Sequence, residues 1–287
     1  MWIPFGIIKD PLGSPTVRSQ ITLMGNKPPV TGVPILIDGD ILAYRAASVL
    51  GWTEGTVSNT PIHAKMSMVG GVLEPIISSI FENTQVLSLE EEFYGTRLKS
   101  STGEFFLTGS TNFRNQIAKT HVYKGHRSSS AKPLALVYCR DYLCSYYGAI
   151  TSVDEEADDL ISKRSHELDY QCVVVSVDKD FLQLPCWHFN TMHNSWTKLS
   201  PQEATKFFYT QILTGDVADN IKGLHRVGPV KAASILEGAT TEWDMYCRVR
   251  EAYGEDQQDY LVENARLLWL RRGEGQIWQP PINTEVG

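Results

Sequence analysis

The sequence predicts an α/β protein built on a parallel sheet that helices cover on both faces. Three short apolar runs, at residues 33–37, 135–138 and 172–177, are continuous rather than alternating, which is typical of strands buried on both faces. Around these runs we expect helices at about 74–93, 112–119, 139–148, 155–169 and 200–213. Strands that alternate with helices along the chain predict the α/β class.

The composition of the 287-residue chain is that of a globular protein. Hydrophobic residues make up 42 % and charged residues 21 %, which excludes the fibrous and wholly disordered classes. No run approaches about 18 uninterrupted apolar residues, and the proline-rich N-terminus lacks an export signal, so we expect a soluble protein. Five cysteines with no paired spacing predict buried free thiols. Residues 1–32 lack periodicity and predict a flexible arm.

Charge is distributed unevenly along the chain. The net charge of −7 argues against a nucleic-acid partner when it is taken alone. Between residues 114 and 140, however, there are six cations and no acid, and five of the six residues from 154 to 159 are acidic. The cations of this stretch are Arg114, Lys119, Lys124, Arg127, Lys132 and Arg140. A basic stretch beside a carboxylate cluster indicates an enzyme that holds a polyanion and concentrates divalent metal.

Acidic side chains follow two of the predicted strands at their carboxyl ends, which meet at one edge of a parallel sheet. These pairs are Asp38 with Asp40 and Asp178 with Asp180; Glu155, Glu156, Asp158 and Asp159 open a predicted helix, and Asp216 and Asp219 follow downstream. An acidic first turn is also ordinary helix electrostatics, which is the simpler interpretation of Glu155. For the whole set we favour hard divalent ions such as Mg²⁺, and a magnesium-dependent phosphoryl-transfer site, over scattered surface acids.

The segment 221–236 has the pattern of a helix, a tight turn with glycine and a second helix. Gly228 allows close approach of a phosphate, Pro229 suits the first helical turn, and Lys231 lies nearby. The alternative is a plain hairpin of core helices. Binding to the nucleic-acid backbone is favoured, and such contacts carry little base specificity.

Five short motifs, taken in order, resemble those of the flap endonuclease and 5′-nuclease family, closest to the small 5′→3′ exonucleases of tailed phages. They are Asp38-Gly39-Asp40, Tyr123-Lys124-Gly125-His126-Arg127, Glu156-Ala157-Asp158-Asp159, Ser176-Val177-Asp178-Lys179-Asp180-Phe181 and Gly215-Asp216-Val217-Ala218-Asp219-Asn220. The resemblance implies a PIN-like catalytic α/β domain over 33–200. It also implies a helix–three-turn–helix DNA-binding region with C-terminal helices over 201–287.

The resemblance also implies roles for single residues. Asp38, Glu156 and Asp158 resemble the ligands of a first Mg²⁺ ion, with Asp159 close to both ions; Asp178, Asp180 and Asp216 resemble those of a second, with Asp219 as its outer partner. Lys124 and Arg127 resemble the cationic pair that grips the scissile phosphate. Tyr44 and Arg45 resemble residues that stack on or clamp the terminal nucleotide, with plain helix residues as the equal alternative. The expected DNA contacts also include Arg114, Gly223, Arg226, Gly228 and Lys231. Mn²⁺ is expected to substitute for Mg²⁺, and K⁺ is expected on backbone carbonyls of the 223–231 turn.

One position departs from the family pattern. Members commonly carry an aspartate after the second strand, where this chain has Gly109, so the first metal loses a ligand; Asp40 is either its replacement or a helix cap. The leading hypothesis is a 5′→3′ exonuclease and flap-type nuclease, active on duplex or flapped DNA and on RNA primers in RNA–DNA hybrids. Its setting would be phage DNA replication or host DNA degradation in the host cytoplasm, with phage replication proteins as partners. The alternatives are a structure-specific DNA-binding protein with weakened or lost catalysis, and a ribonuclease without DNA preference.

Overall fold

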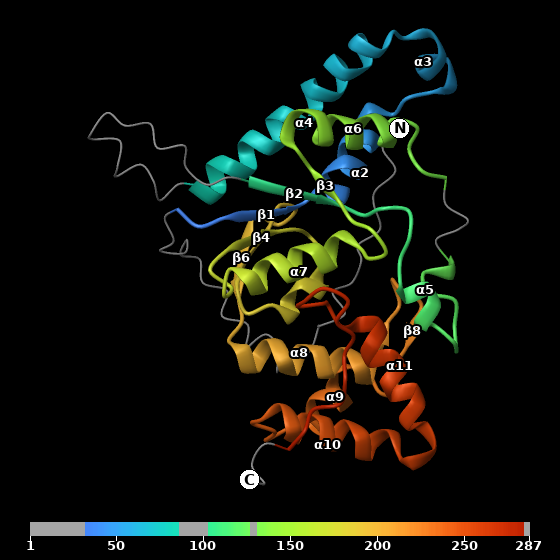
Figure 1. Ribbon diagram of the computed structural model, residues 1–287, viewed down its shortest axis with the longest axis vertical. Helices are drawn as coiled ribbons and strands as arrows, with labels where there is room; N and C mark the ends of the chain where they lie inside the picture. The colour runs from blue at the N-terminus through green and yellow to red at the C-terminus, as the bar shows by residue number, and fades with distance from the viewer. Residues whose placement is uncertain (1–31, 86–102, 127–130, 284–287) are drawn as a thin grey trace, which may run out of the picture.

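The computed structural model describes residues 32–85, 103–126 and 131–283. Its centre is a six-stranded sheet made of β1 (Ile35–Asp38), β2 (Gly103–Leu107), β3 (Ile150–Thr151), β4 (Val173–Val175), β5 (Trp187–Asn190) and β6 (Ser195–Lys198). The order across the sheet is β3-β2-β1-β4-β5-β6, and every pair is parallel except β5 with β6 (Figure 1). β1 therefore lies at the centre, beside β2 and β4, and the carboxyl ends of all three strands point to the same edge.

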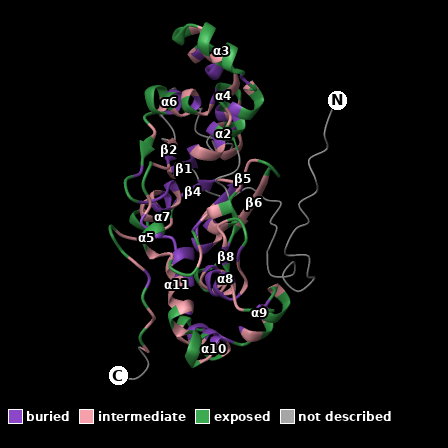
Figure 2. Cartoon of the chain, turned by 90° about the vertical axis from the view of Figure 1, so that its right-hand side faces the viewer, coloured by how far each residue is buried: buried purple, intermediate pink, exposed green. Residues whose placement is uncertain are grey.

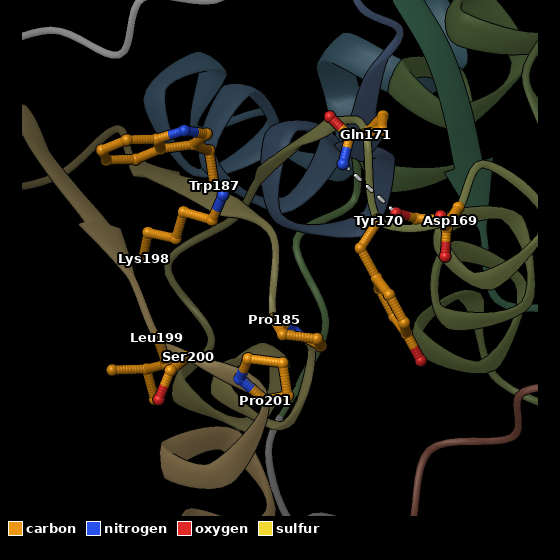
Figure 3. Close-up of a pocket in the computed structure, with 9 residues that line it drawn as sticks. All are labelled: Asp169, Tyr170, Gln171, Pro185, Trp187, Lys198, Leu199, Ser200 and Pro201. Atoms are coloured by element: carbon orange, nitrogen blue, oxygen red, sulfur yellow. Dashed lines mark hydrogen bonds between the residues drawn. The ribbon is translucent and has the colours of Figure 1, made fainter.

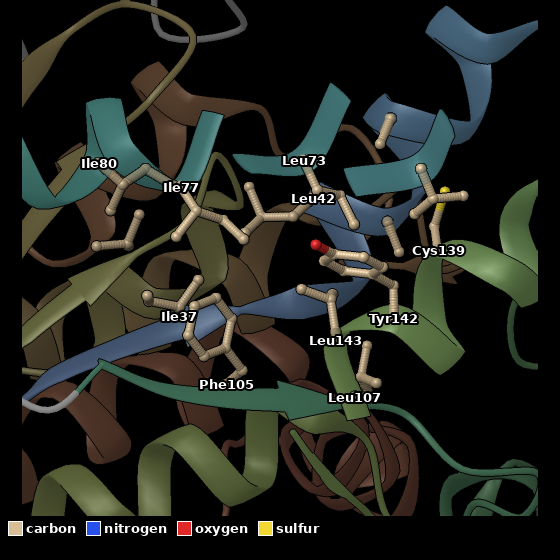
Figure 4. Close-up of a cluster of buried hydrophobic side chains, with 14 of the residues drawn as sticks. Ile37, Leu42, Leu73, Ile77, Ile80, Phe105, Leu107, Cys139, Tyr142 and Leu143 are labelled. Atoms are coloured by element: carbon tan, nitrogen blue, oxygen red, sulfur yellow. The ribbon is translucent and has the colours of Figure 1, made fainter. Parts of the chain in front are cut away.

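Helices cover both faces of the sheet, as the continuous apolar strands require. One face packs against α2 (Gly39–Leu50), α4 (Ile62–Gln85) and α6 (Leu136–Tyr147). The other face packs against α7 (Ala157–Glu167) and the short helix η3 (Lys179–Gln183). Alternate residues of β1 serve the two cores: Ile35 and Ile37 belong to the first, shown in Figure 4, and Leu36 belongs to the second.

The C-terminal part of the chain forms a helical region below the sheet in Figure 1. It consists of α8 (Pro201–Thr214), the small pair β7 (Gly215–Asp216) and β8 (Ile221–Lys222), α9 (Pro229–Ile235), α10 (Glu242–Tyr253), η4 (Glu255–Gln257) and α11 (Gln258–Leu268). These elements share a third core, whose buried residues line the inside of the helices in Figure 2. The described residues also form the short helices α3 (Glu54–Asn59) and α5 (Arg114–Ile117). Tyr123 from the chain before α6 packs into this third core, so the region is tied to the sheet.

The predicted α/β class is confirmed, with two corrections to the elements. The run at 135–138 is not a strand, because it forms the start of α6. The strand that pairs with β1 on that side of the sheet is β2, which the sequence did not predict. Four apolar residues in a row do not distinguish a strand from a buried helix, and Cys139 and Leu143 continue the helical spacing. The first half of the 221–236 segment is the bridge β8 rather than a helix, while α9 begins at Pro229 as expected. The predicted arm lies outside the described residues, apart from Gly32.

Helix α4 is long and apolar enough, over Ile62–Thr84, to cross a membrane by length and composition alone. Its apolar residues Val69, Leu73, Ile77 and Ile80 are buried in the core that α4 shares with α2 and α6. One face of α4 therefore belongs to the core of the α/β layer, while about a third of the apolar window as a whole is buried (33 %). All five cysteines are free, and three of them are buried.

Candidate active site

A cleft of about 670 Å³ opens at the carboxyl ends of β1, β2 and β4, where ligands bind in open α/β sheets. Six carboxylates and three cations line it: Asp38, Asp40, Glu156, Asp158, Asp178 and Asp219 with Lys124, Lys132 and Arg140. The acids come from four separate segments of the chain. Of the predicted site residues, the structure brings seven into this one cleft: Asp38, Tyr44, Lys124, Glu156, Asp158, Asp178 and Asp219.

Asp38 is the last residue of β1 and the N-cap of α2. One carboxylate oxygen accepts a hydrogen bond from the backbone N–H of Ile41 at 3.3 Å, and the other accepts one from the Ser176 hydroxyl at 2.8 Å. Burial, reinforced by the charges of Asp40 and Asp178, raises the pKa of Asp38 from 3.8 to about 7. The fold thus holds this carboxylate firmly, in a place where its charge is unfavourable without a cation.

Asp158 and Asp178 line the same cleft as Asp38. Asp158 lies in the first turn of α7, and burial together with the charges of Asp38 and Asp178 raises its pKa well above the ordinary value. Asp178 caps η3, and its carboxylate accepts the backbone N–H of Asp180 at 2.9 Å. Mutual repulsion among fixed carboxylates is relieved when a cation binds between them.

Asp180 and Asp216 lie behind Asp178 and do not line the cleft directly. Burial and the neighbouring Asp178 charge raise the pKa of Asp180 to about 7. The Lys179 ammonium donates to both carboxylates, to Asp180 at 3.0 Å and to Asp216 more closely. Lys179 therefore lies between two members of the second predicted acidic set.

A compact polar network joins the basic stretch to the acids. The Lys124 ammonium donates to Glu156 at 2.5 Å and lies 3.6 Å from a carboxylate oxygen of Asp219. The Tyr123 hydroxyl contacts the same two acids, at 2.8 Å and 2.7 Å. Lys124 has φ = 52°, a conformation that is uncommon outside glycine, and its backbone N–H donates to the Asp219 carbonyl. The strained backbone aims this cation into the cleft.

The donor set fits hard divalent ions, since it consists of carboxylate oxygens crowded enough to shift their own pKa values. Within the described ranges, no three His, Cys, Asp or Glu side chains form a ready-made metal cluster. Lys124 and Lys179 each donate to members of the predicted sets, so the ligands would reach a shared ion only after these ammonium groups move. Asp38, Glu156 and Asp158 are the candidates for one ion; Asp178, Asp180 and Asp216 are those for a second.

Gly109 is required by its surroundings. A Cβ at this position would lie 2.1 Å from the Ser152 carbonyl oxygen, and the Gly109 N–H donates to the Ser152 hydroxyl at 2.9 Å. An aspartate therefore has no room at this position on the present backbone. The neighbouring Asp40 accepts the Thr108 N–H at 2.8 Å and pairs with Arg140, which also donates to the Thr108 carbonyl. Asp40 thus anchors the end of β2, and it is not the N-cap of α2, which is Asp38.

Two predicted roles are wrong. The Asp159 carboxylate is completely buried and accepts two hydrogen bonds from Arg114, at 2.5 Å and 2.9 Å, and one from the Arg271 backbone at 3.1 Å. Arg114 is only 2 % exposed and also donates to the Leu267 and Trp269 carbonyls, so it has no access to DNA. The pair joins α7 to the C-terminal region instead of serving the cleft, because a buried charge must find a partner.

The other predicted contacts lie in different places. Tyr44 is half exposed and lines the cleft, whereas the adjacent Arg45 lines a separate groove with Asn83 and Asn194. Arg127 lies outside the described residues. In the 223–231 turn, Arg226, Gly228 and Lys231 are exposed, and Gly223 packs tightly on the backbone of Thr214 and Gly215.

Another hollow, of about 510 Å³, is shown in Figure 3. It is lined by residues that precede β4 or begin β5, including Gln171, Pro185 and Trp187, and by the start of α8. These are the amino ends of parallel strands, the edge opposite the cleft. Asp169 and Lys198 are its charged lining residues, so it lacks the crowded carboxylates that mark the first site.

Sequence reasoning did not assign roles to three residues of the site. Tyr123 and Lys179 both lie within motifs that carry the family resemblance, so their position was a usable signal. Arg140 belongs to the basic stretch, but its pairing with Asp40 spans 100 positions and has no local signature. Long-range pairs of this kind appear only in the folded chain.

Comparison with known proteins supports one family. No protein-family model matches the chain. A flap endonuclease Xni from Shewanella halifaxensis is 32 % identical over 163 residues, covering 52 % of this chain and 64 % of the relative. The same enzyme from Shewanella baltica is 30 % identical over 129 residues, covering 40 % of this chain and 49 % of the relative. The chain thus spans between about half and two thirds of these relatives.

Solved structures share the fold at low identity. A bacteriophage T5 flap endonuclease in complex with DNA and metal ions superposes with a TM-score of 0.56 at 16 % identity, covering 82 % of this chain and 88 % of that one. Flap endonuclease-1 from Methanococcus jannaschii has a TM-score of 0.50 at 15 % identity, covering 86 % and 81 %. The sheet and its flanking helices are therefore those of 5′-nuclease structures.

Proposed function

We propose that the chain belongs to the 5′-nuclease and flap endonuclease family, and that it hydrolyses phosphodiester bonds of DNA near 5′ ends. The observation that carries the proposal is the cleft in which Asp38, Asp158 and Asp178 lie together beside the cationic Lys124, where burial and neighbouring carboxylates raise the pKa values of Asp38 and Asp158. A site of this charge pattern binds divalent ions and, through them, a phosphate.

The residues of the cleft, together with the neighbouring Asp180 and Asp216, divide into two tasks. Asp38, Glu156 and Asp158 would hold one Mg²⁺ or Mn²⁺ ion, and Asp178, Asp180 and Asp216 a second, with Asp219 beside them. When bound, such ions lower the pKa of a water molecule and neutralise charge on the phosphate. Lys124 supplies a positive charge at the cleft, where negative charge develops on the phosphate oxygens, and Tyr123 and Asp219 fix its position.

The exposed turn 223–231 is the proposed grip on the DNA backbone. Gly228 has no heavy atom within 4 Å of a would-be Cβ, so a phosphate can approach its backbone, and Lys231 adds charge on the following helix. K⁺ on the carbonyls of this turn belongs to the same proposal. A role in phage DNA replication or host DNA degradation, with flapped DNA and RNA–DNA hybrids as substrates, belongs to the same proposal.

The test is nucleotide release from 5′-labelled duplex and flapped DNA during titration with Mg²⁺ and Mn²⁺. We expect metal-dependent release that Asp158→Asn combined with Asp178→Asn abolishes. Asp256→Asn, an exposed acid on η4, removes the same kind of charge far from the cleft and should leave the rate unchanged. Equal cleavage by the double variant and the parent would end the proposal.

A second candidate is a structure-specific DNA-binding protein with weakened or lost catalysis. Gly109 favours it, because no carboxylate can occupy that position on this backbone. Binding of flapped DNA in chelator, with no cleavage at any Mg²⁺ or Mn²⁺ concentration, would identify this protein rather than the nuclease.

A further inference from the structure

Lys179 lies between two of the proposed metal ligands. Its ammonium donates to Asp180 at 3.0 Å and, more closely, to Asp216. In the described part of the chain, no other cation forms an ion pair with either carboxylate. The Asp216 side chain is 3 % exposed and that of Asp180 18 %, so two largely buried negative charges depend on one lysine.

The two carboxylates are held in place independently of the lysine. Asp180 accepts a hydrogen bond from the Gln211 amide at 2.6 Å, and Asp216 accepts the backbone N–H groups of Ala218 at 2.6 Å and Asp219 at 3.3 Å. The Lys179 side chain, in contrast, is 45 % exposed. It can leave toward solvent while the two acids stay fixed, because nearly half of the side chain already meets solvent and a long, flexible lysine can turn its charged end outward.

We propose that Lys179 is an internal competitor of the divalent cation at Asp180 and Asp216, an inference that rests on the proposed metal-dependent function. The ammonium and the metal ion require the same carboxylate oxygens, so occupation by one excludes the other. The lysine neutralises the pair when it is bound there, and it sets the metal concentration at which the second ion enters. Ion entry frees a positive charge at the edge of the cleft.

Isothermal titration of the full chain with Mn²⁺ tests this competition. Lys179→Met should bind the weaker ion about 3- to 30-fold more tightly than the parent, the range expected for the loss of two partly exposed ion pairs. Lys179→Arg keeps the charge and should resemble the parent. Lys198→Met is the matched control for net charge, since this exposed lysine lies over the Trp187 ring, away from both acids.

Thermal unfolding in EDTA gives a readout that needs no metal. In EDTA, Lys179→Met should lower the melting temperature by about 2–4 °C relative to the parent. In a second series with Mn²⁺ in place of EDTA, the melting temperature of Lys179→Met should rise by more than that of the parent. Unchanged Mn²⁺ affinity in Lys179→Met, or weaker affinity, alongside normal binding by the parent would overturn the competition alone. Binding by Lys179→Met but not by the parent would support it strongly. Absence of Mn²⁺ binding in both proteins would defeat the proposed function and this inference together.

Discussion

The buried carboxylate of Asp38 makes the stability of this protein depend on pH. Its pKa is raised from 3.8 to about 7 in the folded chain, so the folded state holds the proton more tightly than the unfolded state. We therefore expect the free energy of unfolding in chelator to decrease as pH rises between about 4 and 7, where only the folded state keeps the proton. Asp180, also raised to about 7, adds to the same trend.

We predict that Asp38→Asn flattens this decrease, since the amide carries no charge at any pH in the window. Urea unfolding in EDTA at half-unit steps from pH 4 to pH 8 measures it. Asp256→Asn should keep the full slope, because Asp256 is exposed. An identical slope in Asp38→Asn and the parent would show that Asp38 titrates normally.

The buried pair of Arg114 and Asp159 predicts a large loss of stability rather than a loss of DNA binding. Arg114→Met leaves a completely buried carboxylate without its ionic partner, which costs about 3–5 kcal/mol. Arg164→Met is the control: Arg164 pairs with Glu104 and Glu167 on the surface, and its loss should cost less than about 1 kcal/mol. Equilibrium denaturation compares the two. Full stability with weakened DNA binding in Arg114→Met would contradict the structural role.

At the scale of the element, the end of β2 shows why Gly109 cannot be restored to an acid. We predict that Gly109→Ala lowers stability by about 1–3 kcal/mol, because its Cβ would collide with the Ser152 carbonyl. Gly71→Ala, on α4, has open space around its Cβ and should instead stabilise the helix by roughly 0.5–1 kcal/mol.

Calorimetric melting of both variants provides the measurement. Gly109→Asp should be destabilised at least as strongly as Gly109→Ala, and its affinity for Mn²⁺ should not improve. A tighter Mn²⁺ affinity in a well-folded Gly109→Asp protein would contradict this prediction. It would mean that the backbone at the end of β2 moves readily enough for an aspartate at position 109 to bind the metal.

A helix or strand can be predicted from the sequence where neighbouring residues alone determine it. The strand at β1 and the helix after Glu156 follow from a continuous apolar run and an acidic first turn. The run at 135–138 was misassigned because its four residues suit either a strand or a buried helix, and only packing against α2 and α4 decides. Asp159 was misassigned for a related reason: adjacent acids on one helix turn face different directions, and its partner Arg114 is 45 positions away.

At the scale of the whole molecule, the cleft depends on contacts between the sheet and the C-terminal region. Asp219 and Asp216 belong to the segment around β7 and β8, whereas Glu156 and Asp38 belong to the α/β layer. The Asn220 side-chain amide donates a hydrogen bond to the Val122 carbonyl at 2.9 Å. The carboxylate of Glu263, on α11, accepts hydrogen bonds from the backbone N–H and the hydroxyl of Thr120. The sequence motifs predict these residues one by one, but only the folded chain brings them together at one site.

Tyr123 links the α/β layer to the C-terminal region, since its hydroxyl contacts both Glu156 and Asp219. A substitution at Tyr123 therefore tests whether the cleft depends on contacts between these two regions. We predict that Tyr123→Phe lowers the free energy of unfolding by about 1.5–3 kcal/mol, the range for a hydrogen bond to a charged group. It should also slow cleavage, because Lys124 loses the neighbour that fixes its acidic partners.

Hydrogen exchange distinguishes this role from general weakening of the fold. In Tyr123→Phe, the backbone amides of 119–125 and of 216–222 should exchange faster together, since each segment is held by the other. Tyr260→Phe is the matched control: its hydroxyl donates to the Lys222 carbonyl within the C-terminal region, so only the amides near β8 should respond. Faster exchange confined to 119–125 in Tyr123→Phe would show that the two regions hold the cleft independently, because a shared support would release both segments at once.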